Sequence, residues 1–168
     1  MLTGLFRGGI HMPTPTMAEQ YRDFIKENGI QGFQMMKLED DRGTVVFRGL
    51  FEYKKAGKLL PVSVIFDNTI YIVVRIGLFE HSVEDKDVDA VVSAAHQLNL
   101  ENKLLKWYLA PDRTILMDAC VPTLPENFDA RLIQTVMQVM MDQVDHCYPV
   151  FDKAIGQKKE NEASEEDK

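Results

Sequence analysis

Four strand-like runs follow one another early in the chain, and the connections between them are very short. The runs cover residues 32–38, 44–53, 59–66 and 69–76. In each of the last three, apolar residues alternate along the run and line one face. Because a parallel crossover needs a dozen or more residues, a two-residue turn such as Asp67-Asn68 joins only antiparallel neighbours. The sequence therefore predicts an antiparallel sheet in this half of the chain.

Two helices are expected on either side of these strands. Thr16 and Glu19 fit a capping box at the start of the first helix, and Gly29 follows its end. The second helix is expected to begin at Ser82 with an S-x-x-D cap and to end near Asn102. Acidic residues crowd its first turns, where they complement the positive end of the helix dipole.

The remaining residues indicate a second hairpin and a long last helix. Residues 103–109 and 113–121 are strand-like, and apolar residues recur at three- and four-residue steps over 127–155. Pro149 is expected to kink this helix and Gly156 to end it. The order α-ββββ-α-ββ-α predicts an α+β fold, in which a twisted antiparallel sheet of about six strands carries three helices.

The length of 168 residues suits one domain. We expect a loose N-terminal arm over 1–15, a single domain over 16–156 and a disordered charged tail over 157–168. No apolar run approaches the ~20 residues of a membrane helix, and we expect no signal peptide in the first residues. A cytoplasmic location without membrane contact is therefore predicted.

The net charge of −7 is concentrated in the second half of the chain. Phosphate binding needs clustered Lys and Arg, so no nucleic-acid partner is expected.

No catalytic or metal-binding pattern is present in the sequence. The four histidines lack ligand spacing, no serine lies in G-x-S-x-G, and there is no phosphate-binding glycine loop. Cys120 and Cys147 are flanked by apolar residues and are expected to be buried free thiols, and Asp118 is expected on the solvent side of its strand. We therefore expect no catalytic residue, no metal, no cofactor and no enzymatic activity.

The strand faces opposite the predicted core are half apolar, although a one-sided antiparallel sheet is normally polar there. Either the second helix or the N-terminal arm covers this face, or a dimer contact or partner does. Leu60 is assigned to this face, among residues such as Arg48 and Ser63. Methionines on the last helix could adapt to a partner. The candidate partner-binding residues are Val46, Leu50, Ile65, Tyr71, Val73 and Met141.

The element order and several short stretches resemble the YbjN family of bacterial proteins, whose fold is similar to that of type III secretion chaperones. The stretches are His96-Gln-Leu-Asn99, residues 104–109, residues 115–118 and Tyr148-Pro-Val-Phe151. The resemblance implies helices packed on a twisted antiparallel sheet. It also implies a sensory or regulatory role without known chemistry, and the chaperone relatives dimerise and hold an extended partner segment. It supplies no catalytic residue.

These observations together predict a non-enzymatic, chaperone-like protein-binding module that is homodimeric. It would cover an apolar segment of a protein or peptide partner, driven by apolar burial and strand-edge hydrogen bonds. The alternative is a regulatory domain that senses a small molecule or signal in a pocket between the sheet and the last helix.

Overall fold

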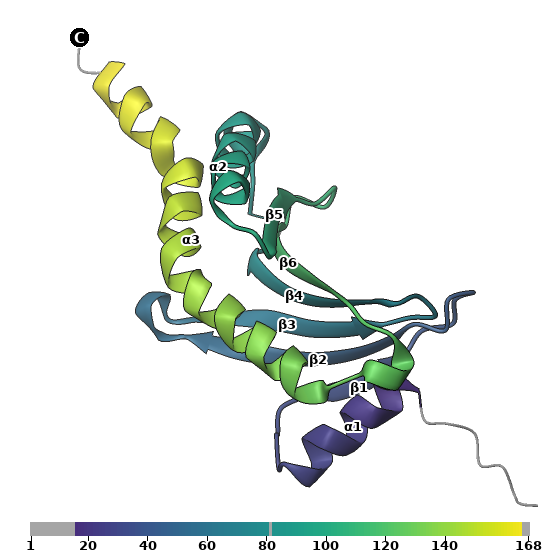
Figure 1. The fold of residues 1–168 in the computed structure, drawn as a ribbon. Coiled ribbons are helices and arrows are strands. Elements are labelled where there is room, and N and C mark those ends of the chain that lie inside the picture. Colours follow the sequence, from purple (N-terminus) through teal and green to yellow (C-terminus); the bar gives the residue numbers. More distant parts are fainter. Residues whose placement is uncertain (1–15, 81, 166–168) are drawn as a thin grey trace, which may run out of the picture.

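The computed structural model describes residues 16–80 and 82–165, with the backbone alone over 157–165. The predicted N-terminal arm over 1–15 lies outside the described residues. The element order α-ββββ-α-ββ-α is confirmed (Figure 1). The elements are α1 (Met17–Glu27), β1 (Gln34–Lys37), β2 (Val45–Tyr53), β3 (Lys58–Phe66), β4 (Tyr71–Phe79), α2 (Val88–Glu101), β5 (Leu105–Leu109), β6 (Ile115–Pro122) and α3 (Ala130–Glu165).

The six strands form one sheet in the order β1-β2-β3-β4-β6-β5, and every neighbouring pair is antiparallel. The predicted α+β class is therefore confirmed. The final hairpin joins the first four strands through the pairing of β4 with β6, which leaves β1 and β5 at the two edges.

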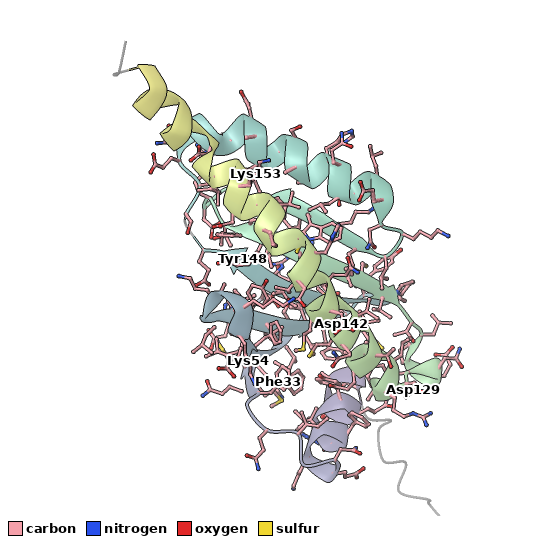
Figure 2. All side chains as sticks on the ribbon, turned by 90° about the vertical axis from the view of Figure 1, so that its left-hand side faces the viewer. Phe33, Lys54, Asp129, Asp142, Tyr148 and Lys153 are labelled. Atoms are coloured by element: carbon pink, nitrogen blue, oxygen red, sulfur yellow. The ribbon has the colours of Figure 1, made fainter. Side chains whose placement is uncertain are left out.

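The helices and one face of the sheet enclose a single hydrophobic core. Figure 2 shows α3 running diagonally across this face, from Asp129 at its start past Tyr148 to Lys153. The Tyr148 ring stacks on Phe79 at 4.4 Å between ring centroids. Tyr21 of α1 meets Phe47 of β2 edge-on at 5.0 Å. We call this the packed face, and the opposite side of the sheet the outer face.

The predicted capping box is confirmed. The Thr16 hydroxyl accepts from the Glu19 backbone N–H at 3.2 Å, and a Glu19 carboxylate oxygen accepts from the Thr16 N–H at 2.8 Å. These bonds satisfy two donors that the first helical turn leaves without intrahelical partners.

The predicted start of the second helix is wrong. The Ser82 hydroxyl donates to the Glu80 carbonyl at 2.7 Å, and α2 begins only at Val88, after a 3-10 turn over Asp85–Asp87. We attribute the late start to tertiary packing. The Val83 side chain is buried in the core, and the backbone around it is irregular. The predicted end near Asn102 is confirmed by α2 ending at Glu101.

The predicted end of the last helix at Gly156 is also wrong. The helix passes through both Pro149 and Gly156 to Glu165, so residues 157–165 of the expected disordered tail are helical. Glycine inside a helix costs about 1 kcal/mol relative to alanine, which the Lys, Glu and Gln residues beyond it offset by good helix propensity. Residues 166–168 lie outside the described part of the chain.

Candidate functional site

The outer face carries a central row of polar side chains that crosses all six strands. Strand register places its members directly opposite one another. The row consists of Gln34, Arg48, Ser63, Arg75, Asp118 and Lys106.

Apolar residues flank this central row on both sides. On one side, register aligns Met36, Val46, Ile65, Val73 and Cys120. On the other side, Leu50 lies opposite Pro61, and Gly77 lies opposite Leu116. A Cβ at Gly77 would lie 2.9 Å from Pro61 Cγ, so only glycine lets these neighbouring strands carry Pro61 here without a shift. The outer face is thus an apolar surface divided by one polar row.

One half of the polar row is locked by internal contacts. Arg75 Nε and Nη2 donate to the two Asp118 oxygens at 2.8 and 2.7 Å, and Nη2 also donates to Tyr108 Oη at 2.8 Å. The Asp118 hydrogen bonds raise the pKa of the Arg75 guanidinium. Partial burial, followed by the Asp118 contact, raises the pKa of Tyr108 to about 12. This cluster holds a fixed shape with its charges internally balanced.

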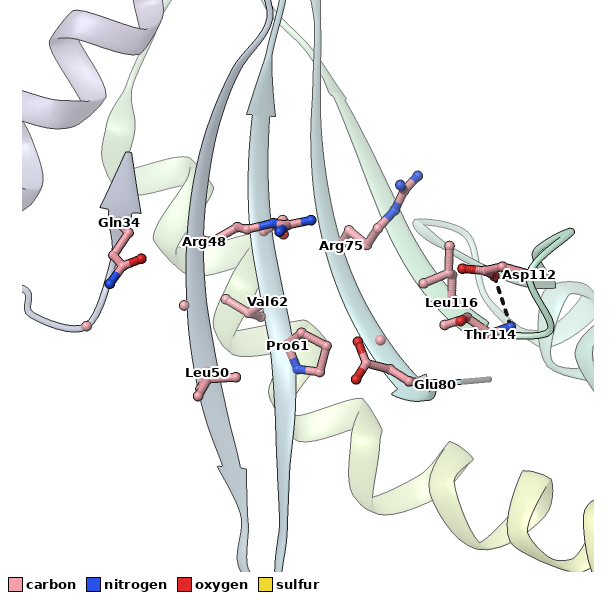
Figure 3. Close-up of a pocket in the computed structure, with 14 residues that line it drawn as sticks. Gln34, Arg48, Leu50, Pro61, Val62, Arg75, Glu80, Asp112, Thr114 and Leu116 are labelled. Atoms are coloured by element: carbon pink, nitrogen blue, oxygen red, sulfur yellow. Dashed lines mark hydrogen bonds between the residues drawn. The ribbon is translucent and has the colours of Figure 1, made fainter. Parts of the chain in front are cut away.

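The other half of the row contains a guanidinium, that of Arg48, without an acidic partner in the described chain. The Arg48 side chain makes no hydrogen bond or ion pair with any residue that the structure describes, and its strand neighbours in the row, Gln34 and Ser63, are uncharged. Figure 3 shows the Arg48 side chain extending over β3.

A groove of about 780 Å³ opens on the outer face around these groups. Arg48 and Arg75 line its polar part, Leu50 and Pro61 its apolar part, and Glu80 lies at its far side from Arg48 (Figure 3). Like that of Arg48, the side chain of Glu80 makes no hydrogen bond or ion pair with a residue that the structure describes. These two side chains therefore add one cation and one anion without a partner in the described chain to the groove, and apolar surface separates them.

Five of the six predicted binding residues lie on the outer face. Leu50 and Tyr71 are the most exposed, at 66% and 52%. Ile65 and Val73 are half-buried. Val46 is only 8% exposed and lies between its neighbours Met36 and Ile65. Their partner-binding role stays a prediction.

Met141 does not join the other five candidates. It lies on α3 and packs partly buried against the core, on the packed side of the sheet. Leu60 was also misplaced, because it is 3% exposed and belongs to the packed face. It has the same strand parity as Val62 and Val64, so consistent counting along the strand would have placed it in the core.

Sequence reasoning missed the contribution of the second hairpin to this face. Leu116 and Cys120 of β6 extend the two apolar rows, but nothing local in the sequence says that β6 pairs with β4. The prediction that Cys120 is buried is wrong: it is exposed, because Ala119 and Val121 take the packed positions on either side of it. Asp118 lies on the outer face as expected.

Cys147 is buried as predicted. Burial raises the pKa of its thiol to about 11, which leaves it protonated and unreactive at neutral pH.

Neither of the two cavities described lies between the sheet and the last helix, where the sequence predicted a pocket. The α3 side chains that face the sheet, including Met140, Val144 and Phe151, are fully buried in close packing. Of the two cavities described, one is the outer-face groove and the other, about 670 Å³, lies between the start of α1 and the turns before β2 and after β3. These two cavities are the places that the described residues offer to a small molecule.

One edge of the sheet is closed by a side chain from α2. Asn99 Nδ2 donates to the Trp107 carbonyl at 2.9 Å, and the Trp107 N–H donates to Asn99 Oδ1 at 2.8 Å. The amide thus occupies the outward main-chain groups at the centre of β5, where an added strand would bind. The predicted strand-edge hydrogen bonds are blocked here, and the other edge, β1, has only four residues.

The described residues hold no group of three or more potential metal ligands among His, Cys, Asp and Glu. None of the helices in the described part is long and apolar enough to span a membrane.

Comparison with known proteins gives a likeness of fold. No family model and no curated relative matches the sequence. Among solved structures, the chain is similar to YbjN from E. coli, a protein put forward as a transcription regulator, with a TM-score of 0.51 and 10% identity. The match covers 87% of this chain and 96% of YbjN. The resemblance to YbjN seen in the sequence is therefore confirmed as a shared fold, and the chain has the YbjN fold over nearly the whole length of that protein.

Proposed function

We propose that this chain is a regulatory protein-binding module that seats a segment of a partner protein on the outer face of its sheet. The observation that carries the proposal is that no helix of the described residues covers this face, although apolar side chains line both sides of its polar row. The likeness of fold to a protein put forward as a regulator supports a regulatory role.

Exposure and position make the outer face suitable for an extended segment. Leu50 and Tyr71 lie on opposite sides of the polar row, several residues apart along the strands. Aromatic side chains such as Tyr71 are enriched at the centre of protein interfaces, and Leu50 adds exposed apolar surface on the other side of the row. Because Asn99 closes the β5 edge, we place the partner on the outer face rather than as an added strand at that edge.

The chaperone-like mode of action and the homodimer belong to this proposal as well. A chaperone-like module would shield an apolar partner segment from water, and apolar burial would drive binding at roughly 25 cal/mol per Å² of buried apolar surface. A homodimer that leaves the outer face accessible would present two such faces. No catalytic activity and no metal or cofactor are part of the proposed function, and the proposed location remains the cytoplasm.

A small-molecule sensor is the second candidate, favoured by one observation. The groove holds Arg48 and Glu80 without partners among the described residues, an arrangement that suits a small zwitterion. A thermal-shift screen with free amino acids separates the two candidates. A rise in Tm that Arg48→Gln abolishes would support the sensor and count against the protein-binding module.

The proposed function is tested by selecting binders from a displayed library of random dodecapeptides. Leu50→Asp and Tyr71→Asp should lose the peptides that the unmodified chain enriches, with their circular dichroism unchanged. Leu100→Asp is the matched control, because Leu100 on α2 is 69% exposed, close to the 66% of Leu50. If all four proteins enrich the same peptides, the outer face is not the binding surface. If an Asp variant of the outer face unfolds, its residue belongs to the core.

A further inference from the structure

We propose that Arg48 anchors an acidic side chain of the partner segment, so that the outer face selects an aspartate or glutamate flanked by apolar residues. This inference rests on the proposed function and names the chemistry of the segment that the same face would bind. Its basis is the one guanidinium in the groove that lacks a carboxylate partner within the described chain.

The two groove arginines differ in what their own chain offers them. Arg75 is held by both oxygens of Asp118 and by Tyr108 Oη, so its donors point into a satisfied cluster. Arg48 faces only the uncharged Gln34 and Ser63. An incoming carboxylate therefore finds open guanidinium donors at Arg48 and an already neutralised guanidinium at Arg75.

The surroundings of Arg48 would strengthen such an ion pair. Along β2, the neighbours of Arg48 on the outer face are Val46 and Leu50. On β3, Ile65 and Pro61 lie opposite these two residues. A segment that covers these apolar groups would exclude water from around the guanidinium. Charge-assisted hydrogen bonds are roughly twice as strong as neutral ones, and a lower local dielectric strengthens them further.

The position of Arg48 also sets the spacing of the partner sequence. Side chains on one face of an extended segment recur every second residue, about 6.6 Å apart. With an acidic residue over Arg48, its neighbours two positions away on each side would lie over Val46 and Leu50. The expected pattern is apolar-x-acidic-x-apolar.

Other charged groups on the face agree with a single acidic position. Glu80 on the far side of the groove would repel a second acid there. Asp118 already faces Arg75, and Lys106 lies beyond it at the β5 end of the row. The cationic site at Arg48 thus has apolar residues on both sides along β2. Across the groove it faces the neutralised Arg75–Asp118 pair and the Glu80 carboxylate.

Selection from the same dodecapeptide library tests this inference with the full-length chain. The unmodified protein should enrich Asp or Glu between apolar residues at the stated spacing. Arg48→Gln should lose the preference for acid, and Arg48→Glu should exchange it for Lys or Arg. The matched control is Arg131→Gln, which removes an exposed arginine from α3, far from the outer face, and should keep the acidic preference.

A titration with the best selected peptide gives the size of the effect. Replacing its acidic residue by the corresponding amide should weaken binding about tenfold to the unmodified chain and very little to Arg48→Gln. Equal losses with both proteins would overturn the acidic anchor.

The outcomes separate this inference from the proposed function. Peptides that depend on Leu50 but show no acidic preference would overturn the Arg48 anchor and leave the protein-binding function standing. Peptides that bind independently of Leu50 would overturn both. If the unmodified chain is a dimer by light scattering and Leu50→Asp is a monomer, a second copy occupies the face, and the acidic segment is excluded as its occupant.

Discussion

The two faces of the sheet use the same strands in opposite ways. On β3, Val62 and Val64 are buried under the helices, whereas Ser63 and Ile65 between and beside them face outwards. The packed face is closed by α1, α2 and α3, and the described residues place no helix on the outer face. The comparison teaches that the outer face exposes apolar side chains that no described helix covers, which is the physical reason for assigning binding to it.

The largest expected effect comes from the packed face. Phe47→Ala removes a fully buried ring that contacts Tyr21 at 5.0 Å and Phe66 at 5.8 Å between ring centroids. We expect the free energy of unfolding to fall by about 3–5 kcal/mol, because the cavity left behind adds to the lost burial. Urea unfolding measures this. A loss below about 1 kcal/mol would mean that this face is not the core.

An intermediate effect is expected from the polar cluster on the outer face. Asp118→Asn removes the charge that both Arg75 donors meet. Because Arg75 keeps access to water, we expect a loss of about 1 kcal/mol in the free energy of unfolding, less than for a fully buried pair. Urea unfolding of Asp118→Asn alongside Asp129→Asn separates this cluster from a surface contact, because Asp129 forms an exposed ion pair with Arg131 at the start of α3. Equal losses would contradict the idea of a locked cluster.

Alkaline pH should report the burial of one tyrosine on each face. Burial raises the pKa of Tyr21 on the packed face, and the pKa of Tyr108 on the outer face is raised to about 12. Both phenols keep their protons in the fold at pH values where the unfolded chain has lost them. Their contribution to stability is therefore present below pH 10 and is lost as pH rises through the folded pKa.

Comparing urea unfolding at pH 8 and pH 11 measures this loss. Tyr21→Phe and Tyr108→Phe should each reduce the pH dependence by a similar amount, because both phenols are still protonated in the fold at pH 11. A variant that leaves the pH dependence unchanged would contradict the burial of its phenol.

The smallest effect on stability is expected at the exposed leucines. Leu50→Asp and Leu100→Asp should each change the free energy of unfolding by no more than about 0.5 kcal/mol, because neither side chain is buried. Thermal unfolding followed by circular dichroism measures both. A loss of 2 kcal/mol or more at Leu50 alone would show that something covers the outer face.

Much of the fold followed from local signals in the sequence. The capping box at Thr16 and alternation in β2–β4 are patterns of a few residues, and the structure keeps them. The errors arose where tertiary packing overrides a local signal. Burial of Val83 delays α2 beyond Ser82, and helix α3 continues through Gly156.

The candidate site was less predictable than the fold. Alternation along each strand placed Leu50 and Tyr71 on the outer face. Predicting the groove would also require knowing which strands are neighbours in the sheet. The pairing of β4 with β6, which adds Leu116 and Cys120, brings together segments about forty residues apart. Met141 lies apart from the other five candidates, and helical periodicity alone does not show which side of α3 meets the sheet.

The central claim is that the outer face is uncovered, and Cys120 is a natural probe of it. This exposed thiol lies beside Val73 on the face, whereas Cys147 is fully buried, and the chain has no other cysteine. The measurement is the reaction of the folded, full-length protein with Ellman's reagent, with Cys120→Ser as control. We predict that one thiol per chain reacts rapidly at a rate independent of protein concentration, and that the second reacts only after unfolding. Protection of Cys120 would contradict the account: protection lost on dilution would show a second copy on the face, and protection that persists would show that the chain covers it itself.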